Sequence, residues 1–264
     1  MSEPIVPVVI VVDGLISSGK TTYINTLHNQ LTKRGWTVTI VKEPIDEWNR
    51  KGPNGEPSFF ELYNADKKRW SYHFQTKAFL DRVEENRTAF ERYGATSQIF
   101  ILERFCSTDR IFMASLYEEG YVTDMELAHY KQWADRWQLV MPYSPDLFIY
   151  LDTPIDACMN RIPERNRSGE EGITKAYQET LKRHHDAFFA GDNVKISEGD
   201  DNEVPCIKIR TVENYRDDEE VQKRFADHFE NLVKCILAER IMANDPWATD
   251  IFQGNNRFTE LRSE

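Results

Sequence analysis

The chain has 264 residues, of which 40% are hydrophobic and 29% are charged, an ordinary composition for a folded protein. Its formal net charge of −11 argues against a broad nucleic-acid-binding surface, because such surfaces rely on clustered lysine and arginine. No segment reaches about 18 consecutive apolar residues, so no membrane span is expected. The cysteines are Cys106, Cys158, Cys206 and Cys235, without a C-x-x-C pair, and we expect reduced thiols.

A strand-like segment followed by a glycine-containing loop lies near the N-terminus. Residues 8–12 are all valine or isoleucine, and an apolar run without polar alternation favours a strand buried on both faces. The residues that follow Asp13, GLISSGKT, match the pattern G-x-x-x-x-G-K-S/T. In this pattern the glycines let backbone N–H groups face a polyphosphate, the lysine reaches its phosphates and the threonine helps to hold Mg²⁺. A nucleoside triphosphate site is therefore predicted at Gly14, Ser17, Ser18, Gly19, Lys20, Thr21 and Thr22.

Strand and helix patterns alternate along the rest of the chain. Further strands are expected over 37–41, 99–102, 147–151 and 206–210, the last as an edge strand because Lys208 interrupts it. Helices are expected over 20–33, 67–93, 124–140, 175–189 and 219–243. Residues 51–58 and 191–205 have the composition of loops. Five strands that alternate with helices predict an α/β fold, a parallel sheet with helices on both faces.

A single domain over residues 1–264 is the simplest organisation, because no repeat or linker divides the chain. Residues 161–172, RIPERNRSGEEG, combine three arginines and three glutamates with Gly and Pro, and we interpret them as a mobile flap. The tail from 246 to 264 has little periodicity and is expected to be loose or to pack on a neighbour. The N-terminus resembles neither a secretory signal nor a transit peptide, so the cytosol is the expected location, with the nucleus left open.

The phosphate-binding loop alone leaves ATPases, GTPases and small-molecule kinases open, although no N-K-x-D guanine motif is present. Further blocks separate these classes: GLISSGKTT is followed in order by KEPIDEW, RWSYHFQTKAFLDR, ERFCSTDRIF and RIPERNRSGEEGI. From residue 8 to about residue 230 the chain therefore resembles the deoxynucleoside kinase family, in particular its deoxycytidine and deoxyguanosine kinase branch. The resemblance implies a P-loop kinase fold with a five-stranded parallel sheet in the order 2-3-1-4-5, an arginine-rich lid over 161–172, and a homodimer.

The resemblance also assigns the charged residues that follow the strands. Glu43 would take the proton from the sugar 5′-hydroxyl, and we expect a raised pKa for a carboxylate in a phosphate-rich site. Arg104 would bridge Glu43 and the transferred phosphoryl group, for which a planar guanidinium is suited. Glu103 would orient Mg²⁺ together with Thr21.

In the lid, the resemblance implies that Arg161, Arg165 and Arg167 close over the donor phosphates and offset their charge. Glu170 corresponds to the lid carboxylate that contacts the sugar 3′-hydroxyl. Gly169 stands where relatives often carry Glu, so Glu170 and Glu171 could exchange roles.

The resemblance places the acceptor pocket mainly on the helix over 67–93. Gln75 would make paired hydrogen bonds with the nucleobase edge, with Phe74 packing on the base. The set Ala78, Arg82 and Asp109 is typical of the cytidine and purine branch, and the Arg82–Asp109 pair would favour an exocyclic amine over a 5-methyl group. Trp48 and Tyr63 complete the sugar side, and either Phe112 or Met113 would stack beneath the base.

Two departures from the family pattern affect the expected site. Phe105 replaces the small Ser commonly found after Glu-Arg and could reshape the pocket wall. The donor-base loop contains Asn214 and Tyr215 in place of the usual Asp-Phe type, so ATP is expected only as the default donor.

These observations predict transfer of the ATP γ-phosphoryl group, with Mg²⁺, to the 5′-hydroxyl of a deoxynucleoside. A thymidine-preferring or broad-specificity kinase is the nearest alternative. A nucleoside monophosphate kinase suits Gln75 and Glu43 less well. The alternative from another class is a nucleotide-binding structural subunit without catalysis, which the intact motif residues disfavour.

Overall fold

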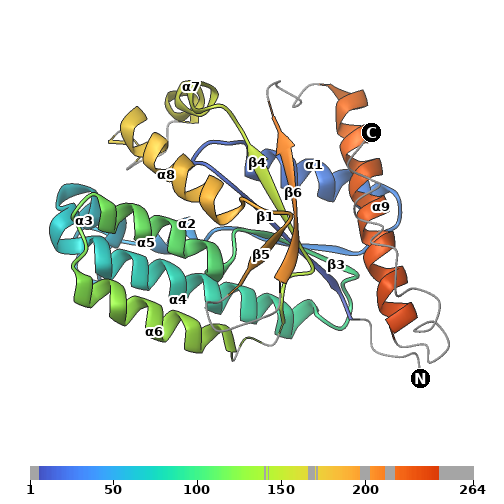
Figure 1. The fold of residues 1–264 in the computed structure, drawn as a ribbon, viewed down its shortest axis with the longest axis horizontal. Helices are drawn as coiled ribbons and strands as arrows, with labels where there is room; N and C mark the ends of the chain where they lie inside the picture. The colour runs from blue at the N-terminus through green and yellow to red at the C-terminus, as the bar shows by residue number, and fades with distance from the viewer. Residues whose placement is uncertain are drawn as a thin grey trace.

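A computed structural model describes residues 6–139, 141, 143–165, 170, 172–196, 203–211 and 218–243. A six-stranded sheet crosses the molecule in the order β2-β3-β1-β4-β6-β5 (Figure 1). Its strands are β1 (Val8–Gly14), β2 (Val38–Val41), β3 (Ile99–Glu103), β4 (Leu147–Asp152), β5 (Asn193–Lys195) and β6 (Glu203–Arg210). The first five strands in this order pair in parallel, whereas β5 is antiparallel to β6. The predicted parallel sheet and its order are confirmed, with one additional edge strand.

Helices surround this sheet. They are α1 (Lys20–Lys33), α2 (Ile45–Trp48), α3 (Phe59–Ala65), α4 (Lys67–Tyr93), α5 (Asp109–Glu118), α6 (Asp124–Leu139), α7 (Ile155–Arg165), α8 (Lys175–Phe188) and α9 (Glu219–Ala243), with a 3-10 turn η1 (Cys106–Thr108). Figure 1 shows α9 along one side of the sheet, while α4 and α6 run together on the other.

Two apolar cores explain why the strand at 8–12 has no polar alternation. Val9 and Val11 pack with the side chains under α4, α5, α6 and α8, a core that includes Phe79 and Phe148. Val8, Ile10 and Val12 point to the opposite face, where α1 and α9 contribute residues such as Phe229. Both faces of β1 are therefore buried, as expected for a central parallel strand.

The parallel register brings the ends of the central strands to one edge. Val12 is paired with Glu103 in β3, and Gly14 is paired with Leu151 in β4. Residues that follow β1 and β3 therefore emerge side by side at the carboxyl ends of the strands, where open α/β sheets bind ligands.

Local sequence signals account for the helices that continue this edge. Ser58 caps α3 by accepting from the Glu61 N–H at 3.2 Å, and Glu61 Oε2 accepts from the Ser58 N–H at 2.7 Å. Asp66 Oδ1 accepts from the Arg69 N–H at 3.0 Å and starts α4. These capping contacts satisfy donors that a helix N-terminus leaves open.

The predicted helices match the structure closely, but several predicted strand boundaries were wrong, and the short strand β5 was predicted as a loop. β1, β3 and β4 each extend to a polar or glycine residue beyond the apolar run: Gly14, Glu103 and Asp152. The segment 191–205 is not entirely a loop, because β5 and the start of β6 lie in it. β6 pairs with β4 through residues 206–210 and with β5 through residues 203–205, so β5 and not β6 is the last strand in the sheet order.

The flap predicted over 161–172 also begins differently from expectation, since α7 continues through Pro163 to Arg165. The tail over 246–264 lies outside the described residues. Within the described part of the chain all four cysteines are free thiols, and no helix is long and apolar enough to cross a membrane.

Candidate active site

The loop between β1 and α1 has a conformation that depends on its glycines. A Cβ on Gly14, where φ is 154°, would lie 2.7 Å from Ser18 Oγ and 2.8 Å from the Leu151 carbonyl oxygen, so this position excludes larger residues. Gly19 has φ 99°, and Ser17 has φ 61°, a left-handed conformation that non-glycine residues rarely adopt. The loop leads directly into the N-terminus of α1, whose free N–H groups and dipole suit a phosphate.

Lys20 begins α1 and lies 5% exposed beneath this loop. Its Nζ donates to the carbonyl oxygens of Leu15 at 2.9 Å and Gly14 at 3.3 Å. Burial and the Arg104 guanidinium lower the pKa of Lys20 to about 8, against the opposing effect of nearby carboxylates. A phosphate bound at the loop would bring a compensating negative charge to this ammonium.

Thr21 and Glu103 meet at the base of the loop. Thr21 Oγ1 donates to the two carboxylate oxygens of Glu103 at 2.9 and 3.1 Å. Thr22 follows in the first turn of α1. A hydroxyl and a carboxylate are hard oxygen donors of the kind that Mg²⁺ prefers, so the two residues fit a magnesium ion held jointly with phosphate oxygens.

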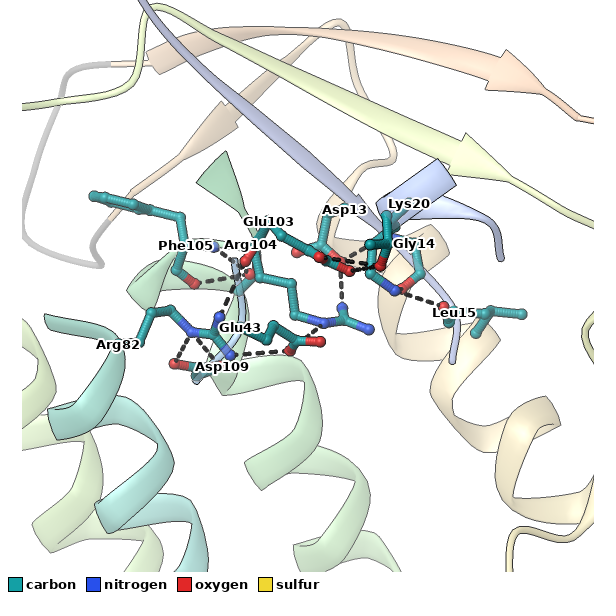
Figure 2. Close-up of polar contacts among 12 residues, drawn as sticks. Asp13, Gly14, Leu15, Lys20, Glu43, Arg82, Glu103, Arg104, Phe105 and Asp109 are labelled. Atoms are coloured by element: carbon teal, nitrogen blue, oxygen red, sulfur yellow. Dashed lines mark hydrogen bonds and ion pairs between the residues drawn. The ribbon is translucent and has the colours of Figure 1, made fainter. Parts of the chain in front are cut away.

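Glu43 lies just beyond β2, between two arginines (Figure 2). Its Oε1 is 3.0 Å from Arg104 Nε and 3.2 Å from Arg82 Nη2. Burial opposes ionisation, but Arg104, Arg82 and Lys20 outweigh it and lower the pKa of Glu43 to about 2. The expectation of a raised pKa was wrong for this structure, because the charges that face Glu43 here are cationic. Glu43 is therefore ionised and able to accept a proton.

Arg104 is the largest fully buried side chain of the protein's described part. Its backbone has φ 66°, and its guanidinium lies 4.7 Å from the Phe112 ring centroid. One edge of the guanidinium forms an ion pair with Asp13, and the other faces Glu43. Arg104 is thus held between two carboxylates, Asp13 at the end of β1 and Glu43 just beyond β2 (Figure 2).

A cavity of about 330 Å³ opens beside these charged groups. Aromatic side chains form much of its wall: Phe74 stacks on Tyr63, with ring centroids 4.7 Å apart, and meets Trp48 edge-on at 5.5 Å. Gln75, next to Phe74, is 5% exposed and lines the same cavity. The cavity has the size and the largely apolar wall, with a few polar groups, that are typical of small-molecule sites.

Arg82 and Asp109 form a buried pair in this cavity. Arg82 Nε donates to the Asp109 carboxylate oxygens at 3.0 and 3.2 Å, and its Nη1 donates to the Glu103 carbonyl oxygen at 3.1 Å. Ala78, one turn before Arg82 on α4, also lines the cavity. Asp109 is 2% exposed, so its charge is balanced by Arg82 and not by water.

The first turns of α5 separate Phe112 and Met113, the two candidates for stacking beneath the base. Phe112 lines the cavity, whereas Met113 is fully buried in the apolar core and does not. Phe105 also packs inside, 6.2 Å from the Tyr143 ring, and is not among the cavity-lining residues. The residue that replaces the usual Ser therefore belongs to the interior and not to the cavity wall.

The lid contributes Arg165, Glu170 and Gly172 to the cavity, and Arg165 and Glu170 form an ion pair with each other. Arg161 is directed to the phosphate-binding loop, where its Nη1 donates to the Ser18 carbonyl oxygen at 3.3 Å. The predicted residues Arg167, Asn214 and Tyr215, and the alternatives Gly169 and Glu171, lie outside the described residues.

Some residues at the site were not predicted. Asp13 and His185 contact Arg104, and Lys67 and Tyr177 line the cavity. Lys67 Nζ lies 4.9 Å from the Tyr177 ring centroid and 5.9 Å from that of Tyr63. Only Asp13 had a signal in the sequence, since it is the first charged residue after an apolar strand; the other three come from helices whose packing no short pattern specifies.

Several known proteins are similar to this chain. A family model described as deoxynucleoside kinase matches residues 10–234. Deoxycytidine kinase of Mus musculus is 30% identical over 228 residues, which cover 79% of this chain and 85% of the mouse protein. The Homo sapiens deoxycytidine kinase is 30% identical over 226 residues, with 78% and 84% covered, and the mitochondrial deoxyguanosine kinase of Xenopus laevis is 27% identical over 244 residues, with 86% and 88% covered. The predicted family is confirmed: this protein belongs to the deoxynucleoside kinases.

Proposed function

We propose that this kinase transfers the γ-phosphoryl group of ATP to the 5′-hydroxyl of a deoxynucleoside, with deoxycytidine and purine deoxynucleosides favoured. The observation that carries the proposal is the position of Glu43. It stands where the phosphate-binding loop meets the aromatic cavity, and it contacts Arg104 on one side and Arg82 on the other.

Glu43 is the proposed general base. A carboxylate with a pKa of about 2 is ionised at neutral pH, and a sugar hydroxyl in the cavity would lie between it and the loop. As phosphate charge gathers near the carboxylate, its affinity for a proton rises, which favours proton transfer during the reaction and not before it.

The cationic groups are proposed to act on the phosphates. Lys20 and Arg104 approach from the loop and from the end of β3, and Arg161 and Arg165 approach from α7. Guanidinium and ammonium groups held in a buried site offset charge on phosphoryl oxygens without reorganising. Positioning and electrostatics of this kind supply most of the catalysis in phosphoryl transfer.

Thr21 and Glu103 are the residues that would hold Mg²⁺. When bound, the ion neutralises phosphate charge and orients the donor. The protein's own part is to keep the hydroxyl and the carboxylate 2.9 Å apart at the base of the loop.

The proposed choice of acceptor base rests on Gln75, Arg82 and Asp109. The amide of Gln75 can both donate to and accept from a base edge, and the buried ion pair leaves a polar wall where a thymine methyl group would need an apolar one. Relatives named deoxycytidine and deoxyguanosine kinases are in accord with this preference. Tyr63 and Glu170 are proposed to face the sugar.

A homodimer is a further part of the proposal and rests on the resemblance to the family. A cytosolic location is another and rests on the expectation drawn from the N-terminal sequence. Sedimentation equilibrium of the purified chain tests the first, and fluorescence microscopy of the tagged chain tests the second.

The proposed activity is tested by a phosphoryl-transfer assay with ATP, Mg²⁺ and each of deoxycytidine, deoxyadenosine, deoxyguanosine and thymidine. Turnover of the first three with poor use of thymidine supports the proposal. A preference for thymidine keeps the kinase and overturns the assignment of the base pocket. Bound ATP without turnover of any acceptor would point to a nucleotide-binding structural subunit. Repeating the assay with UTP and GTP determines the preferred donor.

A further inference from the structure

Asp13, Arg104 and His185 form a buried cluster behind the cavity. Asp13 and His185 are fully buried, and Arg104 is 2% exposed. His185 Nε2 lies 3.4 Å from Arg104 Nη1 and 3.3 Å from Asp13 Oδ1. The same Asp13 oxygen accepts from the Gly14 N–H at 2.6 Å, so the cluster is joined to the phosphate-binding loop.

The hydrogen bonds of His185 define its tautomer. Nδ1 lies 2.8 Å from the Leu181 carbonyl oxygen. A carbonyl oxygen only accepts, so Nδ1 carries the proton, and in a neutral ring Nε2 is then an acceptor. Arg104 Nη1 is the donor that faces it. The same Nη1 pairs with Asp13 Oδ1, so it bridges the two acceptors, His185 Nε2 and Asp13 Oδ1, which lie 3.3 Å apart. Burial and the nearby Arg104 charge lower the pKa of His185, against the effect of Asp13, which keeps the ring neutral.

The ring has little freedom to turn away from this contact. Tyr150 of β4 stacks on it with centroids 5.9 Å apart and an interplanar angle of 14°, and Phe112 of α5 meets it edge-on at 6.1 Å. Phe189 lies at 6.5 Å on the same side of the sheet. Among the described residues in contact with His185, the charged ones are Asp13 of β1 and Arg104, which follows β3.

Arg104 is consequently held on three sides. Asp13 and His185 meet its Nη1 edge, the Phe112 ring lies against its face, and its Nε edge points to Glu43. A guanidinium on a flexible side chain loses less entropy on meeting phosphate when its position is already set.

We propose that His185 is a positioning residue: its neutral ring accepts a hydrogen bond from Arg104 and, with Asp13, directs the guanidinium toward Glu43 and the transferred phosphoryl group. The inference rests on the proposed role of Arg104 in phosphoryl transfer. Because His185 itself does not reach the cavity, its loss should lower kcat and leave the KM values for donor and acceptor largely unchanged.

Three variants test the positioning role. His185→Phe keeps a ring without an acceptor and should lower kcat about tenfold or more, the size expected for losing a hydrogen bond to a charged group. His185→Gln supplies an amide oxygen that can accept from Arg104, and it should recover most of the lost kcat. His184→Phe is the matched control, since the adjacent His184 faces Glu118 away from the cavity. Wild-type kcat in His185→Phe, or equal losses in the Phe and Gln variants, would reject the role.

A second measurement needs no turnover. A long-range ¹H–¹⁵N spectrum of the ligand-free protein with ¹⁵N-labelled histidine at pH 7.5 should show one neutral ring protonated at Nδ1 that is absent from the His185→Gln spectrum. A ring protonated at Nε2, or at both nitrogens, would overturn the proposal whatever the kinetics show. If wild-type protein phosphorylates no deoxynucleoside, the proposed function fails, while the spectrum still reports on His185.

Discussion

Arg82 Nη2 lies 3.2 Å from Glu43 Oε1, while Nε of the same guanidinium is bound to Asp109. One arginine therefore contacts both the carboxylate proposed to activate the sugar hydroxyl and the carboxylate proposed to face the nucleobase. The two ends of the acceptor site therefore share the Arg82 cation, so a substitution at one end should alter the electrostatics at the other.

The first prediction concerns acceptor choice. The double variant Arg82→Met with Asp109→Ala removes both charges and gives an apolar wall, so the ratio of kcat/KM for thymidine to that for deoxycytidine should rise at least about tenfold. Steady-state assays with both acceptors measure this ratio. The control is Lys77→Met with Asp81→Ala, which removes an i,i+4 pair from the same helix away from the cavity. An unchanged ratio in the first double variant would remove Arg82 and Asp109 from base selection.

The second prediction concerns the contribution of the Arg82–Asp109 ion pair to the stability of the protein. Arg82→Met alone leaves Asp109 buried without its cation and should destabilise the protein by about 3–5 kcal/mol. Adding Asp109→Ala to the same variant should restore part of that loss. Denaturant unfolding followed by circular dichroism gives both values, and a double variant less stable than Arg82→Met would contradict the explanation.

The third prediction concerns the proposed base. Glu43→Gln should retain nucleotide binding and lose about 10²- to 10⁴-fold in kcat, the usual contribution of a general base. Single-turnover assays and calorimetric titration with ADP measure the two properties separately. Glu47→Gln serves as the matched control, because Glu47 lies one turn further on α2 and pairs with the exposed Arg50. Near-normal turnover in Glu43→Gln would assign the proton to another acceptor.

The fourth prediction follows from the pKa of Lys20, which burial lowers to about 8. At pH 8.5 most ligand-free molecules have a neutral Lys20, and phosphates bound at the loop should raise its pKa again, so ADP binding should take up protons. Calorimetry in buffers of different ionisation enthalpy measures this uptake. Lys20→Arg stays charged and should show none at the same pH; equal uptake by both proteins would contradict the assignment.

The low pKa of Lys20 also has a consequence for stability without ligand. Its pKa is lower in the folded than in the unfolded protein, so between about pH 8 and pH 10.5 the unfolded chain holds a proton that the folded one lacks. The free energy of unfolding should therefore gain a contribution that rises with pH across this window. Below pH 8 both states are protonated, and the gain disappears.

The fifth prediction concerns the metal. Thr21→Val removes the hydroxyl that contacts Glu103 and should raise the Mg²⁺ concentration required for half-maximal turnover, whereas Thr21→Ser keeps the hydroxyl and should change it little. Initial rates across a magnesium titration at fixed ATP give the comparison. Equal requirements in the two variants would place the metal elsewhere.

Long regular segments could be predicted from the sequence because their patterns are local. The apolar run at 8–12 and the unbroken helical period of 67–93 appear in the structure as β1 and α4. The phosphate-binding loop could be recognised because steric limits restrict positions such as Gly14 to one residue type.

Short elements and buried polar contacts were harder to predict, because they depend on distant partners. β5 has three residues and forms only by pairing with β6 across an acidic segment. The choice between Phe112 and Met113 depends on how α5 is rotated against the core. A shift of one residue in the alignment exchanges the two positions, so the sequence alone left both open. The low pKa of Glu43 likewise required knowing that Arg82 and Arg104 both face it.

The pairing of Val12 with Glu103 places constraints on how this protein can diverge. The Arg104 N–H donates to the Val12 carbonyl oxygen at 3.0 Å, so the phosphate-handling residues after β1 and β3 are fixed in one sheet register. An insertion or deletion of one residue in β3 would turn Glu103 and Arg104 each to the face opposite its present one and abolish both proposed roles at once. The cavity walls formed by α3, α4 and α5 do not depend on the register of these strands. Proteins that diverge from this one can therefore change their acceptor specificity through substitutions on those helices, while the lengths of the strands stay the same.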